Sequence, residues 1–260
     1  MSTQKEKAAL FKSLHIQGDP VILFNIWDAG SAKAVADSGA KALATGSAPV
    51  AMANGYPDGQ KFPLDEALAI VSRILNATDL PLTMDLEGGY DTSASGVAES
   101  IEKAMAAGIA GFNFEDQIVG GSGLYSIDEQ VERLKAARAA ADAKGVQGFL
   151  NARTDIFLKA KPDAHTDQMV DDAIERAKAY EQAGADGFFA PGMVDKAQIE
   201  KLISAVSLPV NMIVLPHSPS QEEFTEMGAA RVSYGPTPYR RMISWLKEEA
   251  AAAHAAVQIS

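Results

Sequence analysis

The sequence predicts an α/β fold in which residues 1–260 form one (β/α)8 barrel domain. A short apolar run followed by a longer, amphipathic, Ala-rich segment recurs eight times, and no Pro- or Ser-rich linker separates the cycles. Eight strand-then-helix cycles in one chain favour a closed parallel barrel of the TIM type. A weak internal repeat at the helix ends supports the same architecture.

The apolar runs are the predicted strands, and a helical pattern follows each of them. A short helix is expected ahead of the first strand, where residues 1–11 are charged and helix-prone. A C-terminal helical extension is expected over the Ala-rich residues 248–256. In chain order the predicted strands cover residues 21–26, 42–45, 82–86, 111–114, 148–152, 187–190, 210–214 and 231–234.

Four predicted helices end in a small-residue turn that leads directly into a strand. The backbone just past a helix end commonly turns left-handed, which glycine adopts without strain, so the recurrence marks equivalent turns. A doubly wound open sheet would show the same alternation and is the alternative architecture. No G-x-G-x-x-G follows the first strand, so the usual dinucleotide signature of that alternative is missing. The four turns contain Gly39, Gly108, Gly184 and Gly228.

The composition restricts the partners and the chemistry. A formal net charge of -11 leaves no basic face for a nucleic acid or for an anionic membrane surface. The absence of cysteine excludes disulfides, thiolate metal sites and a thiol acid or nucleophile. No signal peptide and no run of about 20 apolar residues is found, so a cytoplasmic location is expected.

Three acidic residues follow neighbouring predicted strands, at the end of the barrel where active sites lie. Asp85 and Glu87 are two residues apart, so strand geometry points both to the same side, and Glu115 leaves the next strand at the same height. Their repulsion would raise one or more pKa values unless a cation relieves it, and all-oxygen ligands suit Mg²⁺ or Mn²⁺. The alternative is a salt-bridged polar layer that includes Arg153 and holds no metal.

Arg153 is the single Lys or Arg among the polar residues at the predicted strand ends. Its planar fork matches a substrate carboxylate. The alternative is an ion pair with Asp155 or with a metal-site carboxylate, and both arrangements can hold together. The absence of lysine at these ends argues against a Schiff-base aldolase. Thr45, Gly46 and Ser47 follow the second strand, where their backbone N–H groups could approach an anion.

Several motifs, ordered along one barrel, resemble the isocitrate lyase and phosphoenolpyruvate mutase superfamily. The similarity runs from residue 21 to about residue 245, and the motifs are specific as a set although each alone is weak. They are Asn25-Ile-Trp-Asp28, Ala44-Thr-Gly-Ser47 followed by Gly55-Tyr-Pro-Asp58, the acidic stretch Asp85-Leu-Glu-Gly-Gly-Tyr90, Phe114-Glu-Asp116 and Asn151-Ala-Arg-Thr-Asp155.

The resemblance implies a metal-assisted mechanism. Asp85 would ligate Mg²⁺ directly, while Glu87 and Glu115 would act largely through bound water. A small anionic 2-oxo acid would chelate the ion, and bond cleavage next to its carbonyl would leave a pyruvate enolate. The metal, the backbone amides of residues 45–47 and Arg153 would stabilise the negative charge of that enolate.

The expected site extends beyond the metal ligands. Arg153, Asp58 and Glu115 are the predicted catalytic residues, and Asp58 matches an acidic position in a segment near the site that orders around substrate. Trp27 and Asn211, at the ends of the first and seventh strands, are predicted to bind substrate together with Arg153 and residues 45–47.

The loop after the fourth strand departs from the lyase branches of this superfamily. Isocitrate and methylisocitrate lyases carry a Lys-Lys-Cys-Gly-His-like loop whose cysteine is the acid, whereas this chain reads Gln117-Ile-Val-Gly-Gly-Ser-Gly-Leu-Tyr125. The isocitrate-type reaction therefore loses its acid, and Gln117 and Ser122 argue against phosphonate chemistry. The predicted function is a Mg²⁺-dependent lyase that cleaves a C–C bond of a small 2-oxo or 2-hydroxy acid. Decarboxylation of an oxaloacetate-like acid makes the smallest demand on such a site, because CO₂ departs without needing a protonated leaving group.

Two other functions stay open: a phosphonopyruvate or phosphoenolpyruvate mutase or hydrolase, and a non-catalytic relative that binds 2-oxo acids. His217, after the seventh strand, is a candidate for the missing acid, with water the other candidate, or it caps the next helix. His15, His165 and His254 are predicted to be solvent-exposed. By the resemblance alone, terminal helices pack on neighbouring subunits, so a homodimer or homotetramer is expected.

Overall fold

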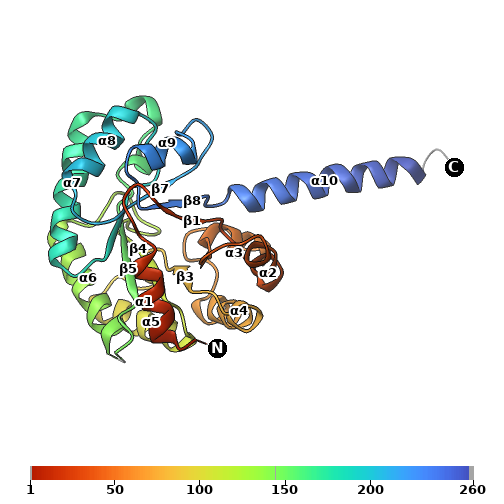
Figure 1. The fold of residues 1–260 in the computed structure, drawn as a ribbon, viewed down its shortest axis with the longest axis horizontal. Coiled ribbons are helices and arrows are strands. Elements are labelled where there is room, and N and C mark those ends of the chain that lie inside the picture. Colours follow the sequence, from red (N-terminus) through yellow and green to blue (C-terminus); the bar gives the residue numbers. More distant parts are fainter. Residues whose placement is uncertain (1, 144, 258–260) are drawn as a thin grey trace.

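Eight parallel strands form one sheet that curves into a barrel (Figure 1). The computed structural model describes residues 2–143 and 145–257, and the strands pair in the order β1-β8-β7-β6-β5-β4-β3-β2. A parallel bridge between Ile26 and Thr45 joins the two end strands. The predicted (β/α)8 barrel is confirmed, and the alternative of an open sheet is wrong. The strands are β1 (Val21–Leu23), β2 (Leu43–Ala44), β3 (Leu82–Asp85), β4 (Gly111–Glu115), β5 (Phe149–Arg153), β6 (Gly187–Phe189), β7 (Val210–Ile213) and β8 (Arg231–Ser233).

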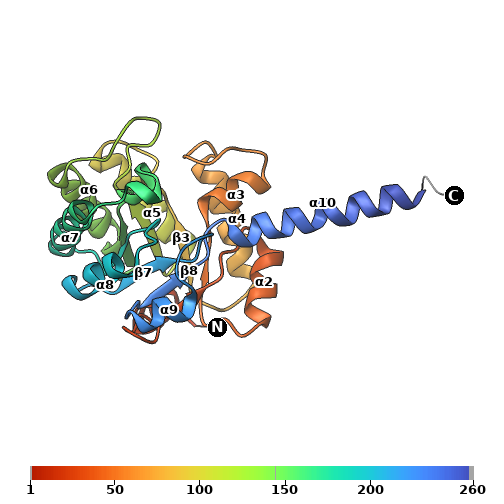
Figure 2. The ribbon, with the colours of Figure 1, turned by 90° about the horizontal axis from the view of Figure 1, so that it is seen from above.

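Helices surround the barrel, and the last one leaves it. Figures 1 and 2 both show α10 projecting away from the other elements. No helix in residues 2–143 or 145–257 has the length and apolar character needed to cross a membrane. The helices are α1 (Gln4–Ser13), α2 (Ala29–Asp37), α3 (Ser47–Ala53), α4 (Leu64–Ala77), α5 (Ala94–Ala107), α6 (Ile127–Asp142), α7 (Asp167–Gln182), α8 (Lys196–Ala205), α9 (Gln221–Glu226) and α10 (Thr237–Val257), with short 3-10 helices at Phe157–Lys159 and Pro162–Ala164.

Each predicted strand is present, but several end earlier than expected, and past β1 a side chain replaces the ladder hydrogen bonds. Residues 21–26 were expected in the first strand, whereas β1 stops at Leu23. Beyond it, the Asn25 Oδ1 accepts hydrogen bonds from the backbone N–H groups of Tyr234 (2.9 Å) and Gly235 (2.7 Å). The Asn25 amide nitrogen donates to the Thr45 carbonyl at 3.1 Å. One side chain therefore ties the ends of β8 and β2 together where the barrel closes.

The repeated glycine turns have the predicted left-handed backbone. The φ angles of Gly39, Gly108, Gly184 and Gly228 are 96°, 108°, 101° and 92°. A residue with a side chain is strained at such φ values. The four positions are thus equivalent stops at which a helix ends and the chain turns into the next strand.

The helix α1 closes the N-terminal end of the barrel and contradicts the prediction that His15 is solvent-exposed. Phe11 is fully buried beside Leu23 and Phe149. The His15 ring stacks on Phe149 with centroids 4.0 Å apart, and its Nδ1 lies 2.8 Å from the Phe11 carbonyl oxygen. Burial, together with the charge of Arg231, lowers the pKa of His15 to about 3. Its Nε2 has no hydrogen-bond partner among the described residues, so a proton there would gain no acceptor.

His15 should make the stability of the fold pH-dependent. The unfolded side chain takes up a proton as the pH falls through about 6.5, whereas the folded ring stays neutral down to about pH 3. The unfolded state therefore binds more protons in this window, and stability falls as the pH is lowered. Between pH 7.5 and pH 5 the wild type should lose about 2 kcal/mol more unfolding free energy than His15→Leu. Urea denaturation at both pH values measures this, and an identical pH dependence would contradict it.

Candidate functional site

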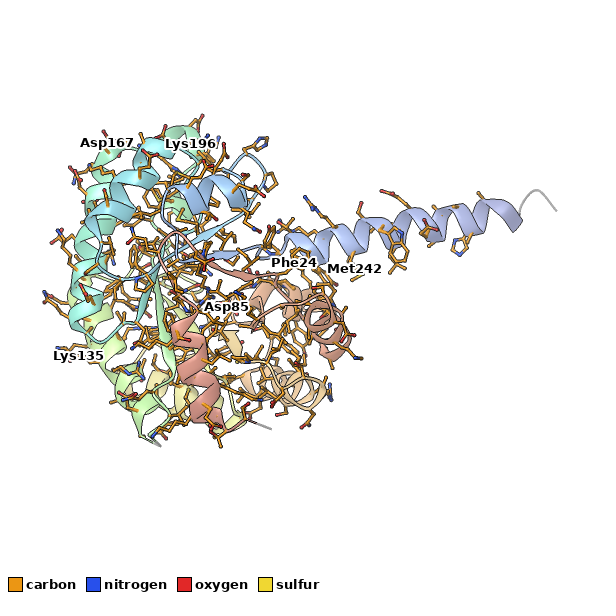
Figure 3. The ribbon with its side chains drawn as sticks, viewed as in Figure 1. Phe24, Asp85, Lys135, Asp167, Lys196 and Met242 are labelled. Atoms are coloured by element: carbon orange, nitrogen blue, oxygen red, sulfur yellow. The ribbon has the colours of Figure 1, made fainter. Side chains whose placement is uncertain are left out.

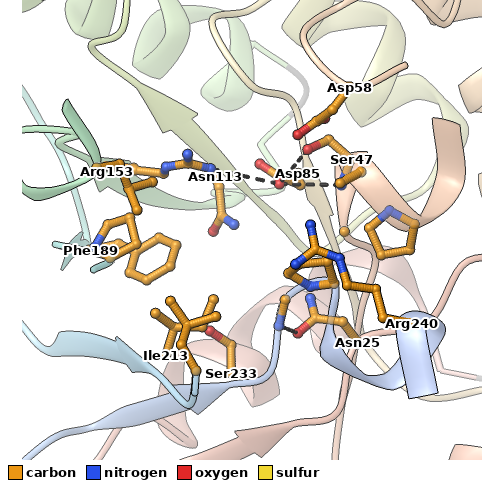
Figure 4. A pocket seen from close by; sticks show the side chains of 18 of the residues that line it. Asn25, Ser47, Asp58, Asp85, Asn113, Arg153, Phe189, Ile213, Ser233 and Arg240 are labelled. Atoms are coloured by element: carbon orange, nitrogen blue, oxygen red, sulfur yellow. Dashed lines mark hydrogen bonds and ion pairs between the residues drawn. The ribbon is translucent and has the colours of Figure 1, made fainter. Parts of the chain in front are cut away.

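The main cavity, with a volume of about 260 Å³, lies at the C-terminal ends of the strands (Figure 4). This is the end at which the loops of a (β/α)8 barrel build active sites. Its apolar wall comes from Leu158, Phe189, Ile213 and Leu215. Its polar lining consists of Asn25, Ser47, Asp58, Asp85, Asn113, Arg153, Arg231, Ser233 and Arg240.

Asp85, the last residue of β3, faces this cavity with one carboxylate oxygen held and the other free. The Oδ2 accepts hydrogen bonds from the Ser47 backbone N–H (3.3 Å) and from the Ser47 hydroxyl (3.0 Å). The Asp85 backbone N–H donates to the Thr45 hydroxyl oxygen at 3.2 Å. The buried Oδ1 has no hydrogen-bond partner among the described residues. A buried anionic oxygen without a donor is the kind of atom that takes a hard cation.

Glu87 lies just past β3 in a left-handed conformation, with φ of 50°. The alternation of a strand therefore does not orient it, yet it lines a small second cavity together with Asp85. Its Oε2 accepts a hydrogen bond from the Gln60 backbone N–H at 2.9 Å. Burial first, and then the charges of Asp85 and Asp58, raise the pKa of Glu87 to about 8. A nearby cation would offset this electrostatic cost and return Glu87 to its ionised form.

Glu115, at the end of β4, is buried and turned toward Arg153. Its Oε2 lies 2.9 Å from the Arg153 Nη1, and its Oε1 accepts from the Gln117 side-chain amide at 3.1 Å. Burial holds the pKa of Glu115 well above its ordinary value despite the opposing effect of the guanidinium. Gln117 in turn accepts a hydrogen bond from the Lys159 ammonium group. The loop that departs from the lyase pattern thus positions Glu115 and supplies no acid to it.

Arg153 forms ion pairs with both Asp155 and Glu115, which were the expected alternative to binding a substrate carboxylate. Its Nε and Nη2 donate to the two oxygens of Asp155 at 2.6 Å and 3.0 Å, and its Nη1 pairs with Glu115. The same Nη1 lies 4.0 Å from the Asp85 Oδ2. The bidentate face predicted for a substrate carboxylate is therefore occupied by Asp155.

The three acidic residues are arranged more loosely than expected for ligands that converge on one ion. Within residues 2–143 and 145–257, no three Asp, Glu or His side chains come together closely enough to hold a metal ion by themselves. Asp85 faces the main cavity, Glu87 the second cavity and Glu115 the guanidinium of Arg153. The free Asp85 Oδ1 nevertheless fits a magnesium ion whose other ligands are water and substrate, since Mg²⁺ usually keeps several waters and takes one or two carboxylates.

The backbone amides of residues 45–47 are already used within the protein, which corrects the predicted anion cradle. The Thr45 N–H donates to the Thr83 carbonyl at 3.1 Å, and the Gly46 N–H to the Ile26 carbonyl at 3.4 Å. The Ser47 N–H donates to Asp85. The first amide continues the pairing of β2 with β3, the second joins the ends of β2 and β1 where the barrel closes, and the third holds the Asp85 carboxylate.

Two predicted substrate-binding side chains do not line the main cavity. Trp27 packs edge to face on Tyr239, with centroids 5.2 Å apart, and lines a groove beside the start of α10. Asn211 is buried, and its Oδ1 accepts a 3.3 Å hydrogen bond from the Ser233 hydroxyl group. Asn211 is the second residue of β7 and not its C-terminal end, which corrects the predicted position, and it does not line the main cavity.

Asp58 lines the main cavity, whereas His217 does not. Partial burial and the charge of Asp85 raise the pKa of Asp58, so its carboxyl group retains a proton to higher pH than an ordinary aspartate. His217 is exposed in the loop after β7, with φ of 73°. His217, the candidate acid, therefore does not line the main cavity.

Sequence reasoning missed two arginines of the cavity. Arg231 is the first residue of β8, and only 1% of its surface is exposed. A search of C-terminal strand ends passes over it, although it shares the inward face of β8 with Ser233 two residues later. Arg240 lies in the first turns of α10, beyond any strand. The alternation of β8 would have identified the first, and no strand pattern indicates the second.

Comparisons with known proteins agree on one family. The sequence profile of the phosphoenolpyruvate phosphomutase family matches residues 11–254. A solved candidate phosphonomutase of Burkholderia cenocepacia is 45% identical, with a TM-score of 0.93, over 96% of this chain and 99% of that chain. An uncharacterized protein of Mycobacterium tuberculosis is 32% identical over 96% of this chain and 88% of its own length. An oxaloacetate decarboxylase of Paraburkholderia xenovorans is 32% identical over 77% of this chain and 66% of its own.

Arg153 should be required for stability, because it neutralises buried carboxylates. Arg153→Met leaves Glu115 and Asp155 without their cation and should lower the free energy of unfolding by about 3–5 kcal/mol. Adding Glu115→Gln should recover part of this loss, since one uncompensated charge is removed. Urea denaturation of the wild type, both single variants and the double variant measures the coupling. Strict additivity of the two single effects would show that the pair does not interact.

Proposed function

The chain belongs to the phosphoenolpyruvate mutase and isocitrate lyase superfamily, and on that premise we propose that it is a Mg²⁺-dependent lyase that cleaves a C–C bond of a small 2-oxo acid. Decarboxylation of an oxaloacetate-like acid is the reaction that its pocket supports best. The named relatives include a decarboxylase and 2-methylisocitrate lyases, so an enzyme of this class is in keeping with the family.

The observation that carries the proposal is the small number of groups in the pocket that can transfer a proton, among which Asp58 is the carboxyl group with a raised pKa. Among the described residues that line the main cavity there is no His, Cys, Lys or Tyr. Retro-aldol cleavage needs a base for the substrate hydroxyl group as well as an acid for the enolate carbon, and a mutase must hold a transferring phosphoryl group. Loss of CO₂ needs only an acid for the enolate carbon, because the leaving group departs uncharged and takes no proton.

Several residues of this chain would have separate roles in the reaction. Asp85 would hold the ion through its free oxygen, Glu87 and Glu115 would add negative charge near it, and the ion would supply Lewis-acid stabilisation of charge on the keto oxygen of the substrate. The electron pair of the broken C–C bond passes into the pyruvate enolate as CO₂ leaves. Asp58 then returns a proton from its carboxyl oxygen to carbon, which gives pyruvate. The apolar wall formed by Leu158 and Phe189 strengthens these interactions by excluding water.

Phosphonate chemistry is the second candidate, because the 45% identical structure is described as a phosphonomutase. A mutase or hydrolase would change the ³¹P resonance of phosphonopyruvate when enzyme and Mg²⁺ are added. A non-catalytic 2-oxo-acid binding protein would produce no pyruvate from any acid. A screen for pyruvate release from 2-oxo and 2-hydroxy acids, with and without EDTA, separates these functions from the proposed lyase.

Asp85→Ala should abolish both metal binding and turnover. The variant removes the free carboxylate oxygen that is proposed to hold the ion, so Mn²⁺ titration followed by electron paramagnetic resonance should show no tight site. Pyruvate release should fall at least about a hundredfold. Asp37→Ala, on the exposed surface of α2, is the matched control and should keep both properties. Near-normal rates in Asp85→Ala would rule out the proposed role.

We also propose that the chain self-associates through α10. Trp245 and Leu246 on this helix are 59% and 50% exposed, an unusual position for large apolar side chains in a helix. An apolar groove that Phe24, Trp27 and Met242 help to line runs beside the start of the same helix, and Figure 3 shows Phe24 and Met242 near its root. One chain thus carries both an uncovered helix and an uncovered groove, which suits a symmetric homodimer or homotetramer.

Charge placed on the exposed face of α10 should break this association. Trp245→Glu and Leu246→Glu should shift the species seen by light scattering toward the monomer, because a carboxylate would be buried in an apolar contact. Lys247→Glu, at the neighbouring exposed position, changes charge without removing apolar surface and is the control. A wild-type protein that is monomeric at concentrations of about 50 μM would refute the proposal, since specific homo-oligomers commonly bind more tightly than this.

A further inference from the structure

Arg133, near the middle of α6, is a buried arginine that the proposed reaction does not use. Only 3% of its surface is exposed, and within residues 2–143 and 145–257 it forms no ion pair. Its Cζ lies 4.0 Å from the ring centroid of Tyr125 and 5.2 Å from that of Phe114. A buried cation without a carboxylate is costly unless its N–H groups are hydrogen-bonded.

The guanidinium of Arg133 donates to two carbonyl groups of the turn that follows β3. Its Nη2 donates to the Gly88 carbonyl at 2.5 Å, and its Nη1 donates to the Thr92 carbonyl at 3.1 Å. These acceptors are four residues apart, so one planar group holds both ends of the segment 88–92. That segment begins directly after Glu87.

The turn held in this way is strained. The φ angles of Glu87, Gly89 and Tyr90 are 50°, 80° and 58°, and only the glycine adopts such a value without strain. With its amide in the orientation that satisfies both groups, the Gln60 side-chain oxygen accepts from the backbone N–H groups of Gly88 (3.2 Å) and Tyr90 (2.9 Å). Strained backbone persists only where its surroundings hold it firmly. Gln60 thus holds N–H groups of the turn, and the guanidinium from α6 holds its carbonyl groups.

The same turn contacts the loop of residues 117–125 after β4. Gly88 packs so closely on this loop that a Cβ there would lie 3.0 Å from the Val119 Cγ2. Tyr125, the last residue of the loop, donates its backbone N–H to the Asp116 carbonyl at 2.9 Å and places its ring against the Arg133 guanidinium. The turn and the loop therefore share one anchor.

We propose that Arg133 is a positioning residue of the metal site, which holds the strained turn of Glu87 in shape and links that shape to the loop of residues 117–125. The inference rests on the proposed function, which puts an ion at Asp85 with the charge of Glu87 beside it. Arg133 lines neither the main cavity nor the second one, so it acts through the turn. Without it, relaxation of the two left-handed residues would move the Glu87 carboxylate away from Asp85 and weaken metal binding.

Hydrogen exchange of the full-length, metal-free protein tests the hold on the turn. Arg133→Ala should speed exchange of the amides in residues 86–93 while the amides of the strands stay protected, because the turn opens locally. Arg133→Lys keeps the charge without the planar fork and should give a smaller increase. Unchanged exchange over residues 86–93 in Arg133→Ala would overturn the inference.

Arg138 provides the matched control on the same helix. It pairs with Asp142 at 2.6 Å and with Asp186 at 2.8 Å, and it makes no contact with the turn of Glu87. Arg138→Ala should lower the stability of the fold without selectively exposing residues 86–93. An equal and selective increase there in both variants would show a general loss of stability in α6 and would also overturn the inference.

Titration with Mn²⁺, followed by electron paramagnetic resonance, tests the consequence for the metal. Arg133→Ala should weaken Mn²⁺ binding about tenfold or more, and Arg138→Ala should bind as the wild type does. Millimolar guanidinium chloride should restore part of the affinity of Arg133→Ala, whereas ammonium chloride should not, since it lacks the planar fork. Wild-type affinity in Arg133→Ala would refute the positioning role. A wild type without a tight Mn²⁺ site would refute the proposed function, and this assignment with it.

The link to the loop is tested by Tyr125→Leu. This variant removes the ring from the guanidinium and leaves both hydrogen bonds of Arg133 to the turn in place. Exchange in residues 86–93 should rise, by less than in Arg133→Ala, because the anchor loses one of its contacts. Exchange identical to that of the wild type would show that the loop and the turn are independent, contrary to the proposal.

Discussion

The charge of Arg153 is shared among carboxylates from three neighbouring strand ends, and the geometry of the pocket depends on that sharing. Glu115 and Asp155 are buried, so each would be strongly destabilising if the guanidinium were absent. With it in place, β4 and β5 are locked together at the level of the cavity. Asp85 lies near the edge of this cluster, 4.0 Å from the same guanidinium, and one of its oxygens has no hydrogen-bond partner among the described residues. Arg153 thus neutralises the buried carboxylates of Glu115 and Asp155, while one oxygen of Asp85 stays without a partner among the described residues.

Backbone groups at the mouth of the cavity join neighbouring strand ends, and side chains form its polar lining. The amides of Thr45 and Gly46 bond across to Thr83 and Ile26, and the Asn25 amide bridges the ends of β8 and β2. A barrel with such short strands has few ladder hydrogen bonds at its seam, so loop amides and one asparagine complete them. The positively charged side chains that line the cavity are the guanidinium groups of Arg153, Arg231 and Arg240.

The sequence was sufficient for the architecture because periodicity and glycine turns are local signals. It was also sufficient for the strand-end placement of Asp85, Glu115 and Arg153, since parallel strands bring their C-terminal ends together. It could not show which acceptor each amide takes, so the use of residues 45–47 was misjudged. Arg231 was not predicted as a cavity residue, because a long side chain can extend from the start of a strand to a cavity at the far end of that strand. The orientation of Trp27 depends on α10, whose direction no local pattern encodes.

Arg240 lies one turn into α10, whose later turns extend away from the strands that carry Asp85 and Arg153. The cation at the mouth is therefore attached to an element that shares little of the barrel's packing. Replacing residues in the opening turns of α10 would therefore change the charge at the mouth of the cavity, while the ion pairs of Arg153 at the strand ends stayed as they are. The electrostatics of the mouth and those of the strand ends are thus carried by separate elements of the chain.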